Sequence, residues 1–274
     1  MIKSVDDLLY EKLGYDKKFK ISKNMELIKI DVGLAGEAPN SAIWLSETKN
    51  RFVIGIEPLS YHWKMLKNLK TANSKREYPK GFKFIQLEKG YVELDGKLVS
   101  MIEDRFCGIQ CAIDDVGKDL YYKDFYEMDR TDGASGSSSL LKPNENHPHF
   151  IENILQVPVV SLESILDYVD WNRFPFIEHI KTDCEGKDFD VVRSIGKYLD
   201  RVLYITSEMA QNTHHWDNSC SQDQFKKWMY KKGFSYKQYA GEICFINNRL
   251  EFMMWRKQMA SKHDMGLNYK TLGH

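Results

Sequence analysis

The chain has 274 residues, of which 42% are hydrophobic and 13% aromatic, enough for the core of one large α/β domain, so a disordered chain is not expected. Its 39 basic and 39 acidic residues give zero net charge, so no nucleic-acid partner is expected. No apolar stretch approaches the ~20 residues of a membrane span, and none resembles a signal peptide, so no membrane partner is expected. The five cysteines are odd in number and widely spaced, which favours reduced thiols and a cytoplasmic location.

One domain is expected to occupy residues 1–274, because no linker or internal repeat divides the chain. Residues 1–24 are charged and predict a helical extension that ends near Gly14. Residues 25–248 form the core. Residues 249–274 are charged and rich in methionine, and they predict a C-terminal tail that is partly helical.

The core opens with an apolar run at 27–32 that predicts a buried strand. Gly33 and Gly36 follow it and predict a tight turn, because glycine tolerates a positive φ and lets a ligand approach the backbone. A helix is expected over 39–48, and its first N–H groups can bind a polar ligand. Asp31 lies at the mouth of this turn, where a carboxylate attracts an ammonium or sulfonium group and repels a pyrophosphate. This feature favours S-adenosylmethionine over NAD as the cofactor.

Strand and helix patterns alternate along the rest of the core, which predicts a parallel sheet with right-handed crossovers. We therefore expect an α/β fold with a Rossmann-like, doubly wound, mostly parallel seven-stranded sheet and a C-terminal antiparallel strand pair. The expected elements in chain order are a strand at 51–58, a helix near 63–69, a hairpin around 95–96, a strand at 106–114, an edge strand at 119–125, a polar loop at 129–150, a strand at 157–160, a helix at 161–169, a strand at 177–186, a helix at 188–196, a strand at 201–208, a helix at 222–232 and the closing pair at 234–239 and 242–248.

Acidic residues fall at the carboxyl ends of the expected parallel strands. Ligands of open α/β sheets bind in the crevice outside these ends, so the acids should converge on one site. A carboxylate has two oxygens, which suit the two hydroxyls of a ribose, and Glu57 follows the second strand. Asp31 is expected to attract the methionine ammonium and Asp114 to accept from an adenine amino group. The five acids are Asp31, Glu57, Asp114, Asp183 and Glu208.

Several segments between residues 25 and 210 match one family pattern. They are I-D-V-G at 30–33, G-I-E-P at 55–58, C-A-I-D-D-V-G at 111–117, S-S-S-L at 137–140, V-S-L-E-S-I-L at 160–166 and I-K-T-D-C-E-G at 180–186. In these segments the chain resembles the FkbM-family methyltransferases, a branch of the class I S-adenosylmethionine-dependent enzymes. It departs from the family at the glycine-rich turn, where Glu37 replaces the second glycine and Gly36 precedes it. The resemblance implies S-adenosyl-L-methionine as cofactor and methyl transfer to a hydroxyl of a sugar or another small natural product.

Methyl transfer to a hydroxyl requires in-line positioning and a group that takes the hydroxyl proton. The expected catalytic residues are Asp183, Glu185, Glu208 and His214, with His215 as an alternative to His214. The expected cofactor-binding residues are Asp31, Gly33, Gly36, Glu57, Asp114 and Asp183. No metal is expected, and Mg²⁺ held by Asp183 and Glu208 is the less favoured alternative.

Each of these residues also has a purely structural interpretation. Asp31 could cap the following helix, Asp114 could pair with the turn at 115–117, and Glu185 could favour a helix dipole. The function has alternatives too: a nucleotide-binding module without turnover or an NAD-dependent dehydrogenase. The dehydrogenase is disfavoured because no G-x-G-x-x-G follows the first strand.

Overall fold

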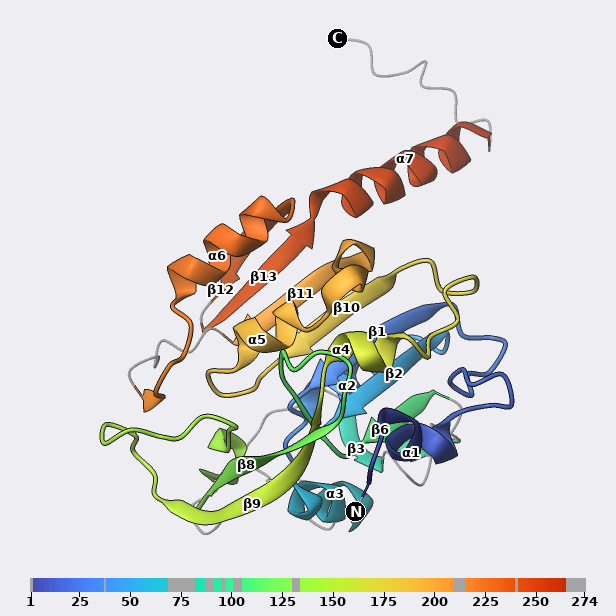
Figure 1. Cartoon of the computed structure of the whole chain (residues 1–274). Coiled ribbons are helices and arrows are strands. Elements are labelled where there is room, and N and C mark those ends of the chain that lie inside the picture. The colour runs from blue at the N-terminus through green and yellow to red at the C-terminus, as the bar shows by residue number, and fades with distance from the viewer. Residues whose placement is uncertain are drawn as a thin grey trace.

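The structure, a computed structural model, has a mixed α/β fold centred on a mostly parallel seven-stranded sheet (Figure 1). Two three-stranded sheets complete the strand structure of the described part of the chain. None of the described helices is long and apolar enough to cross a membrane. The described residues are 2–36, 38–68, 82–86, 91–94, 97–100, 105–129, 134–208, 215–239 and 241–264.

The seven-stranded sheet confirms the prediction of mostly parallel strands with a closing antiparallel pair. In the described chain, β13 is the strand that runs against the other six, and it lies between β11 and β12. In spatial order the strands are β12 (Phe234–Tyr239), β13 (Glu242–Asn247), β11 (Val202–Glu208), β10 (Ile177–Thr182), β1 (Leu27–Val32), β2 (Arg51–Ile56) and β6 (Phe106–Ile109).

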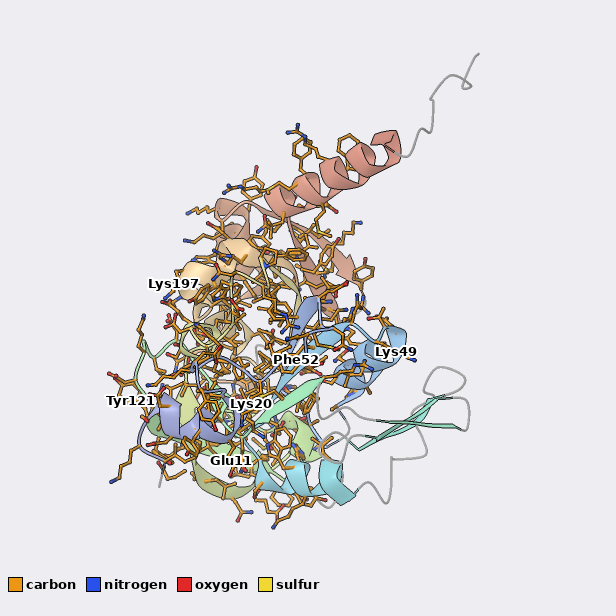
Figure 2. The ribbon with its side chains drawn as sticks, turned by 90° about the vertical axis from the view of Figure 1, so that its right-hand side faces the viewer. Glu11, Lys20, Lys49, Phe52, Tyr121 and Lys197 are labelled. Atoms are coloured by element: carbon orange, nitrogen blue, oxygen red, sulfur yellow. The ribbon has the colours of Figure 1, made fainter. Side chains whose placement is uncertain are left out.

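The central strands form because their apolar runs are buried on both faces, as expected for parallel strands covered by helices. Ile30 and Ile54 are fully buried on neighbouring strands, and Phe52 is only 2% exposed. Figure 2 shows Phe52 inside the body, whereas Lys49 and Lys197 point outward. These side chains belong to one large hydrophobic cluster.

Helices flank the sheet, with α2 against β2 and α6 against β12. A capping box fixes the start of α6, where the Ser221 side chain accepts from the backbone N–H of Gln224 and the Gln224 side chain accepts in return. The helices are α1 (Val5–Leu9), α2 (Pro39–Glu47), α3 (Ser60–Asn68), α4 (Leu162–Leu166), α5 (Asp188–Arg193), α6 (Gln222–Lys231) and α7 (Asn248–Asp264), and the 3₁₀ helices are η1 (Tyr10–Lys12), η2 (Ala134–Ser137) and η3 (Gly196–Arg201).

The prediction of a single strand at 106–114 is wrong, because this segment is divided between two sheets. β6 ends at Ile109, and β7 (Ala112–Ile113) pairs with β9 (Ile151–Val160) in a second sheet. The N–H of Cys111 bonds to the carbonyl of Ile109, a tight local turn that interrupts the strand. β8 (Tyr121–Met128) is the edge strand of this second sheet, so the predicted edge strand is confirmed there.

Two other predicted elements differ in extent. The N-terminal helical stretch ends at Lys12, because Leu13 and Phe19 form an antiparallel bridge around the following turn. β9 begins at Ile151, six residues before the predicted strand at 157–160, because it pairs along most of β8.

The expected hairpin around residues 95–96 has the predicted pairing. β4 (Tyr91–Leu94) and β5 (Lys97–Ser100) are antiparallel, and β3 (Phe82–Gln86) completes that sheet. Residues 95 and 96 themselves lie outside the described residues.

Candidate functional site

A cavity of about 330 Å³ opens at the carboxyl ends of the central parallel strands. The chain passes from β1 to β2 and β6 on one side of β1, and later adds β10 and β11 on the other side, so the strand order reverses next to β1. Ligands of open α/β sheets bind at such a reversal. Residues that end β1, β2, β10 and β11 line the cavity, together with residues 136–138 and Leu140 of the long polar loop.

Gly33 forms the floor of the cavity where β1 ends. Its φ is +85°, and a Cβ built there would lie 2.0 Å from the carbonyl oxygen of Asp183. The ends of β1 and β10 therefore meet without room for a side chain, which explains the glycine. The other left-handed residues of this turn are Ala35 and Ala38, whereas Gly36 has no positive φ and does not line the cavity.

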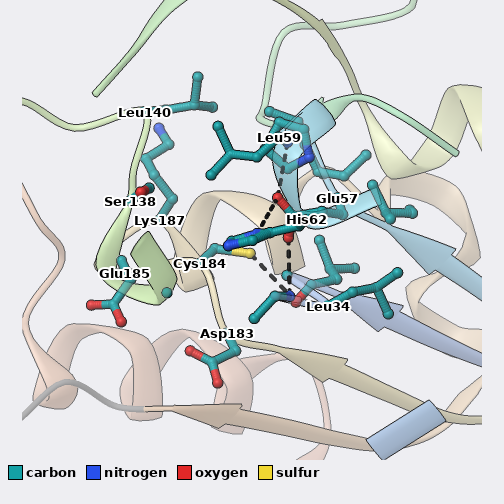
Figure 3. A pocket seen from close by; sticks show the side chains of 18 of the residues that line it. Leu34, Glu57, Leu59, His62, Ser138, Leu140, Asp183, Cys184, Glu185 and Lys187 are labelled. Carbon is teal, nitrogen blue, oxygen red and sulfur yellow. Dashed lines mark hydrogen bonds and ion pairs between the residues drawn. The ribbon is translucent and has the colours of Figure 1, made fainter. Parts of the chain in front are cut away.

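Glu57 lies buried in the cavity wall at the end of β2, with 4% of its surface exposed. One carboxylate oxygen accepts from the N–H of Ala35 at 3.0 Å, and the other accepts from the N–H of Leu59 at 2.9 Å. The second oxygen also lies 3.1 Å from Nδ1 of His62, a buried residue of α3 that lines the cavity. Because an ionised carboxylate accepts about four hydrogen bonds, Glu57 keeps capacity for a ligand hydroxyl. Figure 3 shows Glu57 with His62 on one side of the cavity and Asp183 with Glu185 on another.

Three carboxyl groups, which we call the carboxyl trio, come together at the other side. They belong to Asp183, Glu185 and Glu208, and their oxygens lie within 4.8 Å of one another. All three residues line the cavity, so the structure brings together three of the four expected catalytic residues. Oxygens this close could share one divalent cation, with Glu185 added to the two ligands that the sequence suggested.

The surroundings of the carboxyl trio raise the pKa of two of its members, Glu208 and Glu185. A hydrogen bond with Asp183 and partial burial raise the pKa of Glu208 well above its usual range. Burial and the nearby Asp183 raise the pKa of Glu185 to about 8. The buried ammonium of Lys181 lies 3.6 Å from Asp183 and 3.1 Å from Glu242, and it offsets part of the negative charge.

The backbone of Glu185 is left-handed, with φ of +49°, and the next residue, Gly186, has φ of +88°. The polar loop holds this turn, because the Ser139 hydroxyl donates to the carbonyl of Glu185 at 2.8 Å. A Cβ at Gly186 would lie 3.0 Å from the Trp216 ring and 3.1 Å from Leu141. The polar loop and Trp216, which pairs with it at Pro143, therefore fix the backbone that carries Glu185.

Asp31 lies next to the cavity and does not line it. It is 1% exposed, and its Oδ2 accepts from the N–H and the hydroxyl of Ser41 at 2.9 and 2.6 Å. The helix-capping interpretation is therefore realised. Burial raises the pKa of Asp31 to about 6, and its Oδ1 has no hydrogen-bond partner among the described residues.

Asp114 is also absent from the cavity lining. It ends β7 of the second sheet, where its oxygens lie 2.8 Å from the ammonium of Lys123 and 2.7 Å from that of Lys187. These lysines hold the pKa of the Asp114 carboxyl below its usual value despite burial. An adenine amino group would have to compete with the ammonium groups of both lysines for the Asp114 carboxylate.

The histidines are only partly described. His214 lies outside the described residues. His215 does not line the cavity, and its ring centre lies 5.6 Å from that of His147, whose ring packs at a tilt against Trp216.

The sequence did not assign a site role to Lys187 or Cys184, which line the cavity, and it did not place His62 beside Glu57. Lys187 and Cys184 lie within or directly after I-K-T-D-C-E-G, so their position in that motif was the available signal. His62 lies five residues after Glu57, at the first turn of α3, and only the fold reveals that it turns back towards the carboxylate.

Comparison of the chain with models of known protein families found no match, and comparisons with curated proteins and with solved structures found none either. The geometry of the cavity is therefore the basis for assigning its chemistry.

Proposed function

We propose that this protein is an S-adenosylmethionine-dependent O-methyltransferase that acts on a hydroxyl of a sugar or another small molecule, on a Rossmann-like doubly wound fold. The observation that carries this proposal is the placement of Glu57 and the carboxyl trio around one cavity at the reversal of strand order. The FkbM resemblance in the motifs that supply these residues supports the same function.

The residues present fit the adenosyl cofactor. Leu34, Leu59 and Phe125 give the cavity apolar walls that suit an adenine ring, and Glu57 suits the ribose hydroxyls. The acidic side chains around Asp183 suit a ligand with a positive charge. Asp31 adds negative charge behind the wall, and its Oδ1, which has no partner among the described residues, is an acceptor that a bridging water or an ammonium could satisfy.

The bound cofactor would supply an electrophilic methyl group on a sulfonium. The protein's part is then to orient the acceptor hydroxyl and to receive its proton. Glu185 is suited to receive it in its ionised form, because a pKa of about 8 leaves part of the population ionised near neutral pH and its carboxyl lies in the cavity. Glu208 holds a proton against Asp183, which keeps the local negative charge low enough for the three groups to coexist.

Calorimetry with S-adenosylhomocysteine tests the cofactor assignment. We expect binding by the wild type and a loss of at least about tenfold in affinity in Glu57→Gln, because a charge-assisted hydrogen bond to a ribose hydroxyl is weakened. Glu152→Gln, at an exposed acid of β9, should bind like the wild type. Circular dichroism would check that both variants fold.

A second variant protects the test against a folding defect. A Cβ at Gly136 meets nothing within 4 Å, and this residue lies at the cavity, so Gly136→Trp can obstruct the cavity without crowding the core. Binding of NAD in place of S-adenosylhomocysteine would overturn the proposal. The proposal would also be overturned if Glu57→Gln and Gly136→Trp both bound S-adenosylhomocysteine as tightly as the wild type. Transfer assays against a panel of sugars, with and without Mg²⁺, would then separate an enzyme from a non-catalytic binding module.

A further inference from the structure

Helix α3 holds the acid that follows β2 at two points. Nδ1 of His62 lies 3.1 Å from Oε1 of Glu57, and the indole N–H of Trp63 donates to the backbone carbonyl of Glu57 at 2.7 Å. His62 is 3% exposed and Trp63 is 5% exposed, so both contacts are buried. Figure 3 shows the His62 ring beside the Glu57 carboxylate. We call His62 and Trp63 the α3 clamp, because together they fix the side chain and the backbone of Glu57.

The neighbouring strand β6 leaves room for the α3 clamp. A Cβ built at Gly108 would lie 2.6 Å from the Trp63 ring, so a side chain at this position would displace the indole. Gly108 has no positive φ, so the close approach of Trp63, and not the backbone conformation, explains the glycine. The sequence of β6 is therefore matched to the position of Trp63.

Nδ1 of His62 carries a hydrogen in its contact with Glu57. Without a proton, this nitrogen would present its lone pair to the carboxylate oxygen and be repelled, so the neutral ring favours the tautomer with the proton on Nδ1. A protonated ring carries a hydrogen at Nδ1 as well. In either state, His62 therefore takes up acceptor capacity of Oε1.

The contacts of Glu57 are divided unequally between its two oxygens. Oε1 faces the N–H of Leu59 at 2.9 Å and Nδ1 of His62, whereas Oε2 accepts only from the N–H of Ala35 among the described residues. An ionised carboxylate has about four acceptor positions, about two on each oxygen. Oε1 is therefore filled, and Oε2 keeps one position for a ligand.

We propose that His62 is a specificity-determining residue that occupies Oε1 and so makes Glu57 bind one hydroxyl of the cofactor ribose, through Oε2, and not both hydroxyls. This inference rests on the proposed function, which places the ribose of the adenosyl cofactor at Glu57. A carboxylate with both oxygens open would bind the two adjacent hydroxyls together. His62 acts on the ligand through Glu57 and is in this sense a positioning residue.

Two deoxy analogues of S-adenosylhomocysteine test the proposal in the wild-type protein. One analogue lacks the ribose hydroxyl at C2′ and the other lacks the hydroxyl at C3′. Calorimetry should show that one of the two analogues binds about tenfold more weakly than S-adenosylhomocysteine, because a hydrogen bond to a charged group is lost. The other analogue should bind within about twofold of S-adenosylhomocysteine, because its missing hydroxyl makes no bond to Glu57.

His62→Leu tests the part that the ring plays. It should weaken S-adenosylhomocysteine binding about fivefold, because Glu57 loses a contact that orients its carboxylate. It should change the affinity for the weaker-binding deoxy analogue by less than about twofold, because that analogue makes no bond to Glu57. His62→Asn, which places an amide N–H near the position of Nδ1, should bind both ligands like the wild type. A general packing defect would instead weaken both ligands equally.

Lys64→Leu, at an exposed position of the same helix, is the control and should bind all three ligands like the wild type. Circular dichroism would check that the variants fold. Equal affinities of the wild type for the two deoxy analogues would overturn the inference and leave the proposed function in place. The same conclusion would follow if His62→Leu weakened both ligands equally or neither of them, or if His62→Asn lost as much as His62→Leu. A wild type that does not bind S-adenosylhomocysteine would overturn the proposed function and this inference together.

Discussion

At the residue scale, Asp183 joins the geometry of the sheet to the chemistry of the cavity. Its carbonyl oxygen lies against Gly33, and its carboxyl group bonds to Glu208. The close approach of β1 and β10 therefore fixes the position of the carboxyl trio. A change at Gly33 should affect both stability and the cavity.

Gly33→Ala should be strongly destabilising. The new Cβ would meet the Asp183 carbonyl oxygen at 2.0 Å, and the residue would keep a left-handed φ of +85°. We expect a loss of at least about 3 kcal/mol in the free energy of unfolding, measured with urea, because backbone must move to relieve the clash.

Gly117→Ala is the matched control for this change. Gly117 has a similar φ of +74°, but a Cβ there meets nothing within 4 Å. It should lose only about 1 kcal/mol, the cost of the left-handed backbone. Equal losses of stability in the two variants would show that the close contact between β1 and β10 does not exclude a side chain at position 33.

Some of the site residues could be predicted from the sequence because each of them directly ends a strand. Acids that directly end parallel strands meet at one edge of the sheet, so Glu57, Asp183 and Glu208 could be placed from their strands alone. Asp31 and Asp114 differ because their surroundings depend on partners remote in sequence or on the second sheet. Ser41 covers Asp31, as the helix-capping interpretation allowed, whereas Lys187 binds Asp114, a contact that no local pattern indicates.

At the element scale, α2 depends on β1 for its start. The residue before the helix, Ala38, is left-handed and has no side chain that can cap. Asp31 supplies the missing acceptor by binding the N–H of Ser41 in the first turn. Pro39 and Asn40 of the same turn line the cavity, so the cap also supports the cavity wall.

Asp31→Ala should therefore loosen the start of α2 and weaken ligand binding together. We expect a loss of about 1–2 kcal/mol in stability and faster amide exchange over residues 40–44, measured by hydrogen–deuterium exchange. Ser221→Ala removes the cap of α6, whose residues lie outside the cavity lining, and should cost a similar amount without affecting affinity for S-adenosylhomocysteine. Unchanged exchange in α2 would contradict the capping role.

The sequence predicted the positions of strands and helices wherever the pattern of apolar residues extended over several residues. The parallel strands and the closing pair of β12 and β13 were predicted for this reason. The interval between β6 and β7 was not predicted, because only Gln110 interrupts the apolar run at 106–113 and no glycine or proline lies at the turn. The local bond from Cys111 to Ile109 and the pairing of β7 with β9 are tertiary outcomes.

At the scale of the whole molecule, several buried acids hold protons more tightly than they would in an unfolded chain. Burial raises the pKa of Asp31 and of Asp188 to about 6 each, and the pKa of Glu185 to about 8, while the pKa of Glu208 is raised further by its bond to Asp183. An acid whose folded pKa is raised stabilises the folded protein fully only below its unfolded pKa, near ~4. That contribution is lost as pH rises towards the folded pKa.

Glu185 and Glu208 should therefore make the protein less stable as the pH rises from 7 to 8. Between pH 7 and pH 8, Asp31 and Asp188 are already ionised in both the folded and the unfolded state. Burial lowers the pKa of His179 to about 3, so His179 changes the stability only at lower pH. Glu185 and Glu208 still bind protons only when folded, so the free energy of unfolding should fall by about 1 kcal/mol over this pH unit, after allowance for solvent screening.

Urea unfolding at several pH values measures this slope. Glu208→Gln should roughly halve it, because the amide cannot ionise, whereas Glu11→Gln at an exposed position should leave it unchanged. Stability that is flat or rises over this window in the wild type would mean that Glu185 and Glu208 do not hold their protons in the folded protein.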